Sequence, residues 1–368
     1  MTATLRQAAG NLLVVGLGAT ELTGLERAWL KLVGPAGIIL FRRNIADAKQ
    51  TRALLSEAGM PCAADSLRCV DVEGGTVDRL RDALAPMPSA QAVALAAMTT
   101  HKIGLIHEQG ELVARAVKAF GFNTTLAPVL DIALPESAAV MGTRASAARP
   151  TGVVQYARAF LAGLASQGVV GCGKHFPGLG GGTLDSHLET PEIPRSWREL
   201  WNADLVPYRE LREELPMVMV NHAAYPDTPG KDRPASVSPF WITSVLRKRI
   251  GYRGIIFSDD LEMGGILKFL SIEEAAIAAV RAGMDLLEIC HSPELILRTY
   301  EALLSEAERS SAFRTLLMAR SKQVARQRAK LFAGNLPPAL SARQFEALRA
   351  RILRFGETVA NALESRSA

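Results

Sequence analysis

The residues best suited to chemistry lie in one segment, which begins at Lys174 and His175, directly after a short apolar run that is typical of a buried strand. Pro177 and several glycines follow, and they disfavour a helix or a continued strand, so we expect a loop. Asp185 and His187 stand two residues apart near its far end. An aspartate that accepts a hydrogen bond from one ring nitrogen fixes the tautomer of a histidine, so this pair predicts a general acid/base.

A second candidate group is the pair Asp259 and Asp260, which follows the apolar run 254–258 without a break. A carboxylate at the end of a buried strand is rigidly held, and burial is costly unless the group is paired or used. We therefore predict a nucleophile aimed at an electrophilic carbon. The alternative is a helix cap or an ion pair with a nearby cation, and one of the two aspartates can have that role.

Composition describes a soluble globular protein with a sizeable core, because 48% of the 368 residues are hydrophobic and 21% are charged. The net charge is +5, and basic residues gather in the last sixty positions. We interpret them as a solvated basic helix rather than a nucleic-acid face, because no aromatic residues lie between the charges.

The four cysteines, Cys62, Cys69, Cys172 and Cys290, form no Cys-x-x-Cys pair, and the last three lie in apolar runs typical of a core. No N-terminal signal segment and no apolar run of membrane-spanning length is present. These features predict a cytoplasmic protein without membrane or nucleic-acid partners, and we expect a monomer.

The elements that must position these residues alternate along the chain. Continuous apolar runs predict eight strands at 11–16, 36–41, 67–71, 123–128, 169–175, 216–222, 254–258 and 284–290. Helical spacing predicts helices at 20–33, 47–58, 89–120 (broken near Gly104 and Gly110), 151–167, 197–214, 238–250, 271–282 and 294–307.

Such an alternation predicts a parallel sheet covered by helices, and eight units favour a closed (β/α)8 TIM-type barrel over an open sheet. We assign residues 1–308 to the barrel and residues 309–368 to a helical C-terminal extension packed on it. Active sites of these barrels form at the carboxyl ends of the strands. The residues at those ends are polar: Asp71, Asp131, Lys174, His175, His222, Asp259 and Asp260.

Five ordered motifs resemble glycoside hydrolase family 3, in particular its single-domain bacterial β-N-acetylglucosaminidases of the NagZ type. They are Asp71-Val-Glu-Gly-Gly-Thr-Val-Asp-Arg79, Leu126-Ala-Pro-Val-Leu-Asp131, Val140-Met-Gly-Thr-Arg144, Lys174-His-Phe-Pro-Gly…Asp185-Ser-His187, and Ile256-Phe-Ser-Asp259-Asp-Leu-x-Met263. Two positions depart from the family pattern: Leu179 stands where a second histidine is usual, and Thr76 where an arginine is common.

The resemblance implies a role for each matching residue. Asp259 matches the nucleophile, His187 the acid/base and Asp185 its partner. The sugar-binding positions are matched by Asp71, Arg79, Arg144, Lys174 and His175. The implied reaction is retaining hydrolysis of a terminal β-linked N-acetylglucosamine, with muropeptides of peptidoglycan recycling as the substrate, and it needs no metal or organic cofactor.

Other hypotheses stay open from the residues. Lys174 at a strand end would suit a Schiff-base lyase. The same scaffold could use phosphate in place of water as a phosphorylase, and Leu179 raises the possibility of a sugar-binding protein without turnover. A metal hydrolase is disfavoured by the histidine spacing, and the weak Gly16-Leu-Gly18 signal lacks the full dinucleotide-binding fingerprint.

Overall fold

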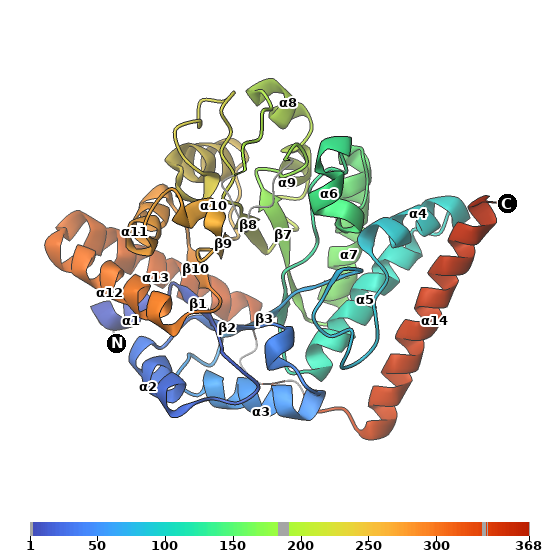
Figure 1. The fold of residues 1–368 in the computed structure, drawn as a ribbon, viewed down its shortest axis with the longest axis horizontal. Helices are drawn as coiled ribbons and strands as arrows, with labels where there is room; N and C mark the ends of the chain where they lie inside the picture. Colours follow the sequence, from blue (N-terminus) through green and yellow to red (C-terminus); the bar gives the residue numbers. More distant parts are fainter. Residues whose placement is uncertain (1–2, 183–190, 333–335, 337, 368) are drawn as a thin grey trace.

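The computed structural model describes residues 3–182, 191–332, 336 and 338–367. Its centre is a closed barrel of eight parallel strands, in the order β1-β2-β3-β6-β7-β8-β9-β10 and back to β1 (Figure 1). The strands are β1 (Leu13–Gly16), β2 (Gly37–Leu40), β3 (Leu67–Val70), β6 (Thr124–Thr125), β7 (Val170–Phe176), β8 (Met217–Val220), β9 (Ile255–Asp260) and β10 (Leu286–Ile289). The predicted (β/α)8 barrel is confirmed.

Helices surround the barrel and connect its strands. The α-helices are α1 (Leu5–Gly10), α2 (Gly24–Val33), α3 (Ala48–Gly59), α4 (Ala90–Thr100), α5 (Gly104–Ala119), α6 (Ala138–Met141), α7 (Pro150–Ser166), α8 (Trp197–Asn202), α9 (Val206–Glu210), α10 (Gly264–Leu267), α11 (Ile272–Ala282), α12 (Pro293–Arg309), α13 (Ser311–Leu331) and α14 (Ala342–Ser367). Helix η5 (Phe240–Arg249) has π-type hydrogen bonding, and short 3₁₀ turns are η1 (Arg42–Asn44), η2 (Pro135–Ser137), η3 (Gly142–Arg144) and η4 (Ala235–Val237). In the described part of the chain, no helix is both long enough and apolar enough to cross a bilayer.

The strands alternate between two apolar environments, which explains their continuous apolar sequence. In β1, Val14 packs in the barrel interior and Val15 packs against the surrounding helices. In β9, Phe257 packs in the barrel interior and Ile256 packs against the surrounding helices. Because both faces of each strand are buried, most polar residues lie toward the strand ends, and Arg68 in β3 and Glu288 in β10 are exceptions.

Two predicted helical regions differ in part from the observed ones. The helical region expected at 89–120 is two helices, α4 and α5, separated at His101, which has φ of 55°, so the break expected near Gly104 is confirmed. Gly110 lies inside α5 rather than at a break, because α7 crosses there so closely that a Cβ atom would lie 2.2 Å from the Phe160 carbonyl oxygen. The helix expected at 197–214 is interrupted between α8 and α9.

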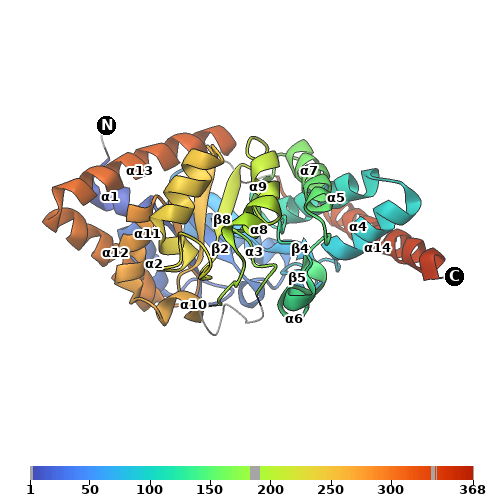
Figure 2. The same ribbon diagram turned by 90° about the horizontal axis from the view of Figure 1, so that it is seen from above.

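The two C-terminal helices pack on different sides of the barrel. α13 lies against α1, α11 and α12, whereas α14 runs along α4 and α5 at the opposite end of the molecule (Figure 2). Arg328 of α13 is buried, and its Nη1 donates to the Ala36 carbonyl oxygen at 2.9 Å. The expectation of a fully solvated basic helix is therefore wrong for this residue, because α13 covers the barrel end where β2 begins.

Candidate active site

A cavity of about 300 Å³ opens at the carboxyl end of the barrel strands. Six of the predicted site residues line it: Asp71, Arg79, Arg144, Lys174, His175 and Asp259. They come from segments up to about 190 positions apart, which the closed barrel brings to one mouth. Asp185 and His187 lie outside the described residues. Leu179 also lines the cavity, so the departure from the family motif faces the site.

Lys174 is the centre of a buried ion-pair network. Its Nζ lies 2.8 Å from Asp71 Oδ1 and 2.6 Å from Glu73 Oε1. Arg144 binds the same Glu73 carboxylate through two hydrogen bonds, from Nε at 2.8 Å and Nη2 at 2.9 Å. Arg79 Nη2 lies 3.5 Å from Asp71 Oδ2. Each carboxylate therefore contacts two cations, which fixes both the charge and the direction of the groups at the cavity.

Sequence reasoning missed Glu73, although it lies in the Asp71–Arg79 motif. A short hairpin of β4 (Val72–Gly74) and β5 (Val77–Asp78) buries its side chain. Burial by itself would raise the pKa of this carboxyl, but Arg144 and Lys174 hold the pKa well below its usual value. Gly74 and Gly75 both have positive φ, so the backbone turns tightly directly after Glu73. In the sequence, the Gly-Gly pair was the signal for this turn.

The state of Lys174 bears on the lyase hypothesis. Burial alone would lower the pKa of its amine, but Asp71 and Glu73 raise it above the usual value. An amine nucleophile must be neutral at the working pH, which requires a depressed pKa. The structure therefore disfavours a Schiff-base lyase and favours Lys174 as a permanent hydrogen-bond donor.

His175 is oriented from both sides. Its Nδ1 lies 2.7 Å from Asp131 Oδ2 and its Nε2 lies 3.3 Å from Arg144 Nη2. Because a carboxylate accepts and a guanidinium donates, these contacts define the tautomer with the proton on Nδ1. Asp131 Oδ1 also accepts from the Leu179 backbone N–H at 2.7 Å, which ties the start of the Gly-rich segment to the barrel.

The two aspartates after β9 have different surroundings. Asp259 lines the cavity, and its Oδ1 accepts from the Asp260 N–H at 3.0 Å. Asp260 Oδ1 accepts from the backbone N–H groups of Glu262 at 3.0 Å and Cys290 at 3.3 Å. Burial, with repulsion from Glu262 and Asp259, raises the pKa of Asp260 to about 7. Asp260 is thus the more structurally engaged of the pair, and it orients the chain that follows β9.

His222 does not reach the cavity wall, contrary to the expectation from its strand-end position. Its Nε2 lies 2.9 Å from the Asp260 carbonyl oxygen and therefore donates, while Nδ1 lies 2.7 Å from Ser236 Oγ. The ring is completely buried. We interpret it as a support for the end of β9, because it binds the backbone directly behind Asp259.

Glu288 is a second site residue that the sequence did not reveal, because it lies inside the apolar run of β10. It lines the cavity while only 3% exposed, and Cys290 Sγ lies 3.1 Å from its Oε1. Its Oε2 has no hydrogen-bond partner among the described residues. Burial, with repulsion from Asp260 and Asp259, raises the pKa of Glu288 well above its usual value.

This raised pKa predicts how Glu288→Gln changes stability with pH. In the unfolded chain glutamate ionises near pH 4.3, so above that pH the folded state holds an extra proton and loses stability as pH rises. The variant lacks this loss, and its unfolding free energy should exceed that of wild type by roughly 1–3 kcal/mol at pH 8 but not at pH 4. Denaturant unfolding across this range measures the difference. The exposed Glu301→Gln should show no such trend, and an equally flat Glu288→Gln difference would contradict a protonated Glu288.

A closed barrel with carboxylates beside fixed cations at its mouth has the arrangement of an active site for a polar substrate. A model of the glycosyl hydrolase family 3 N-terminal domain matches residues 4–327. The chain belongs to this family and is a glycoside hydrolase.

Individual relatives agree with this assignment. A beta-hexosaminidase from Idiomarina loihiensis is 34% identical over 302 residues, covering 82% of this chain and 90% of the relative. A beta-hexosaminidase from Methylococcus capsulatus is 39% identical over 284 residues, covering 77% and 84%. The structure of NagZ from Neisseria gonorrhoeae in complex with N-trifluoroacetyl-D-glucosamine is 30% identical, covers 96% of this chain and 98% of that chain, and superimposes with a TM-score of 0.75.

Proposed function

We propose that this glycoside hydrolase is a retaining exo-β-N-acetylglucosaminidase that removes terminal N-acetylglucosamine from muropeptides during cytoplasmic peptidoglycan recycling. The observation that carries the proposal is the placement of Asp259 on the same small cavity as the Lys174–Asp71–Glu73–Arg144 network. A cavity of about 300 Å³ is at the lower end for ligand sites, which favours a single terminal sugar over an internal chain segment. The N-acylated glucosamine in the Neisseria structure supports the choice of sugar.

The proposed reaction proceeds in two displacements. In the first, a carboxylate oxygen of Asp259 forms a bond to the anomeric carbon as the glycosidic C–O bond breaks, and His187 gives its proton to the leaving oxygen. In the second, His187 takes a proton from water, the water oxygen bonds to the anomeric carbon, and the Asp259 carboxylate leaves. Two inversions retain the β configuration.

The described residues supply binding and orientation. The Lys174 ammonium donates to sugar hydroxyls, while Asp71, held between Lys174 and Arg79, accepts from them. Since these groups are already fixed by ion pairs, little reorganisation is needed as charge develops at the anomeric centre. In this proposal Asp185 orients His187 by accepting from one ring nitrogen.

The acid/base role predicts a leaving-group effect in His187→Ala. Protonation of the leaving oxygen is worth about 10²–10⁴-fold, so kcat/KM for a muropeptide substrate should fall by that factor. The loss should be much smaller for p-nitrophenyl N-acetyl-β-D-glucosaminide, because nitrophenolate leaves without a proton. Equal losses on both substrates would contradict the assignment.

The same assay separates the alternative functions. Wild type is incubated with the nitrophenyl glycoside with and without inorganic phosphate, and the products are identified. Hydrolysis predicts free N-acetylglucosamine in both cases, whereas a phosphorylase yields a sugar 1-phosphate only with phosphate. Binding of N-acetylglucosamine without turnover of the muropeptide or of the nitrophenyl glycoside would indicate a sugar-binding homologue. Leu179→His is then the first variant to test.

A further inference from the structure

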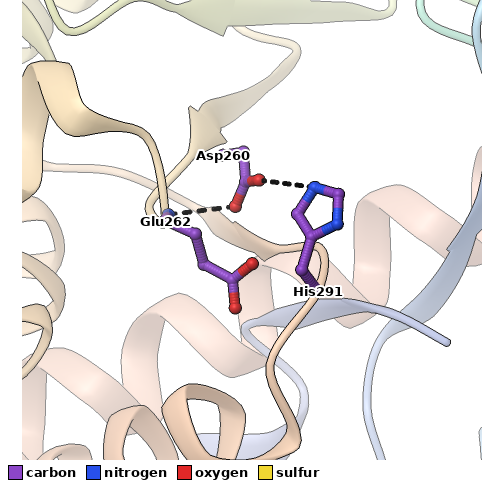
Figure 3. A group of neighbouring side chains, drawn as sticks. All are labelled: Asp260, Glu262 and His291. Atoms are coloured by element: carbon purple, nitrogen blue, oxygen red, sulfur yellow. Dashed lines mark hydrogen bonds and ion pairs between the residues drawn. The ribbon is translucent and has the colours of Figure 1, made fainter. Parts of the chain in front are cut away.

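Three side chains beside the candidate nucleophile form a compact group of metal-ligand types. Asp260 ends β9, Glu262 lies two residues further on, and His291 precedes α12 (Figure 3). One ligand atom of each residue lies within 4.8 Å of the other two. We propose that Asp260, Glu262 and His291 form a binding site for a divalent transition-metal ion of the zinc class, at the rim of the cavity.

Contacts with neighbouring residues hold each of the three side chains in this group. Asp260 uses Oδ1 for two backbone N–H groups, which leaves Oδ2 facing His291. Glu262 Oε1 accepts from the Ser292 N–H at 2.7 Å. The His291 ring stacks on Phe41, with ring centroids 5.4 Å apart and planes at 27°. These contacts keep the three side chains close together before an ion binds, which reduces the ordering cost of binding.

The separation of the ligand atoms favours a shared ion over a direct hydrogen bond. His291 Nε2 lies 3.7 Å from Asp260 Oδ2, which is longer than the 2.7–3.2 Å of such a bond. Two ligands about 2.0–2.1 Å from a tetrahedral zinc ion lie about 3.3 Å apart, so a small closing movement suffices. The His291 side chain is 56% exposed and is able to make that movement.

Charge and ligand chemistry point to the class of ion. The Asp259 carboxylate lines the cavity beside the group and adds to the negative charge of Asp260 and Glu262. This surplus of carboxylates attracts a dication. An imidazole combined with carboxylates suits zinc, whereas magnesium and calcium prefer oxygen ligands throughout.

Occupation of this site should inhibit the enzyme, an expectation that rests on the proposed function. Asp260 is bonded through its backbone N–H to Asp259 Oδ1, so an ion on Asp260 places positive charge close to the nucleophilic carboxylate. That charge stabilises the free carboxylate more than the neutral ester formed from it, and it lowers nucleophilicity. The ion takes no part in the reaction.

The test measures zinc binding directly by titration calorimetry of metal-free protein, with cobalt absorption as an independent report of coordination. We expect one zinc ion per wild-type chain and affinity at least about tenfold weaker in Glu262→Gln and in His291→Asn. His107→Asn is the matched control, because His107 is exposed on α5 far from the cavity in sequence and fold. Circular dichroism spectra and melting curves are used to check that each variant folds.

A further variant separates this site from the acid/base histidine, which is also able to bind zinc. His187→Asn should keep the high-affinity ion if the proposal is right. Loss of the ion in His187→Asn with unchanged affinity in Glu262→Gln, or no binding by folded wild type, would overturn it. Because binding is measured without substrate, failure of the proposed glycosidase activity does not affect this result. Inhibition by zinc is measured separately, as the rate of each variant with zinc relative to the rate of the same variant without zinc.

Discussion

Replacement of Asp259 by alanine should lower kcat/KM for p-nitrophenyl N-acetyl-β-D-glucosaminide by about 10⁴-fold or more. The expected loss is this large because the variant has no group to form the proposed covalent intermediate, and removal of the proposed nucleophile affects every later step. Steady-state release of nitrophenol measures the effect. KM should change less than kcat, because Lys174 and Arg144, the proposed sugar-binding residues, stay paired with Glu73.

A stereochemical measurement makes this prediction specific to a nucleophile. Removal of the Asp259 side chain leaves space below the anomeric carbon, so added azide should partly restore nitrophenol release and yield the α-glycosyl azide by a single inversion. Asp227→Ala serves as an exposed control and should retain wild-type rates. Turnover by Asp259→Ala at the wild-type rate, or formation of the β-glycosyl azide, would be incompatible with the proposed mechanism.

Replacement of Glu73 by alanine should lower the free energy of unfolding by about 3–5 kcal/mol at pH 7. Glu73 is 3% exposed and pairs with both Lys174 and Arg144, so its removal leaves the buried Lys174 and the partly buried Arg144 each short of a partner. Denaturant unfolding monitored by circular dichroism measures the change. The exposed Glu136→Ala should change stability by less than about 0.5 kcal/mol.

The pH dependence of the Glu73 effect has a defined sign. The folded-state pKa of this carboxyl is depressed, so its contribution is present above the unfolded value near 4.3 and decreases as pH falls below it. The difference between wild type and Glu73→Ala should therefore shrink between pH 5 and pH 3. A loss smaller than about 1 kcal/mol at pH 7 would mean that water or Asp71 compensates the two cations.

The Glu73 variant also tests the link between stability and substrate binding. Lys174 and Arg144 are oriented by the same carboxylate, so a folded remainder of Glu73→Ala should bind N-acetylglucosamine more weakly. Glu73→Gln keeps the shape and one acceptor oxygen, and it should lie between alanine and wild type in both properties. The ordering of the three proteins distinguishes charge from packing.

Strand ends were the most informative feature of the sequence. Because every barrel strand is buried on both faces, its apolar run stops where the chain reaches the mouth, and the first polar residues there are site candidates. This reasoning found Asp71, Lys174, His175 and Asp259, all of which line the cavity. It also selected His222, which the fold places behind β9 instead.

The fold was predictable for a related reason, since eight apolar runs alternating with amphipathic helices have few compact arrangements. Helix boundaries were less predictable where tertiary contacts decide them. Gly110 suggested a break, yet α5 continues through it because the missing side chain permits close contact with α7. A glycine that breaks a helix and one that allows two helices to touch look the same in a single sequence.

The sequence by itself determined the barrel, the residues at its mouth and the family resemblance, because these depend on periodicity and on local motifs. Only the tertiary structure decided which neighbours each ionisable group has. Glu73 and Glu288 are both buried carboxyls beside one cavity, yet cations hold the pKa of Glu73 down while burial and other carboxylates raise that of Glu288. Their opposite states arise from partners distant in the chain, since electrostatic interaction depends on separation in space and on burial rather than on sequence order.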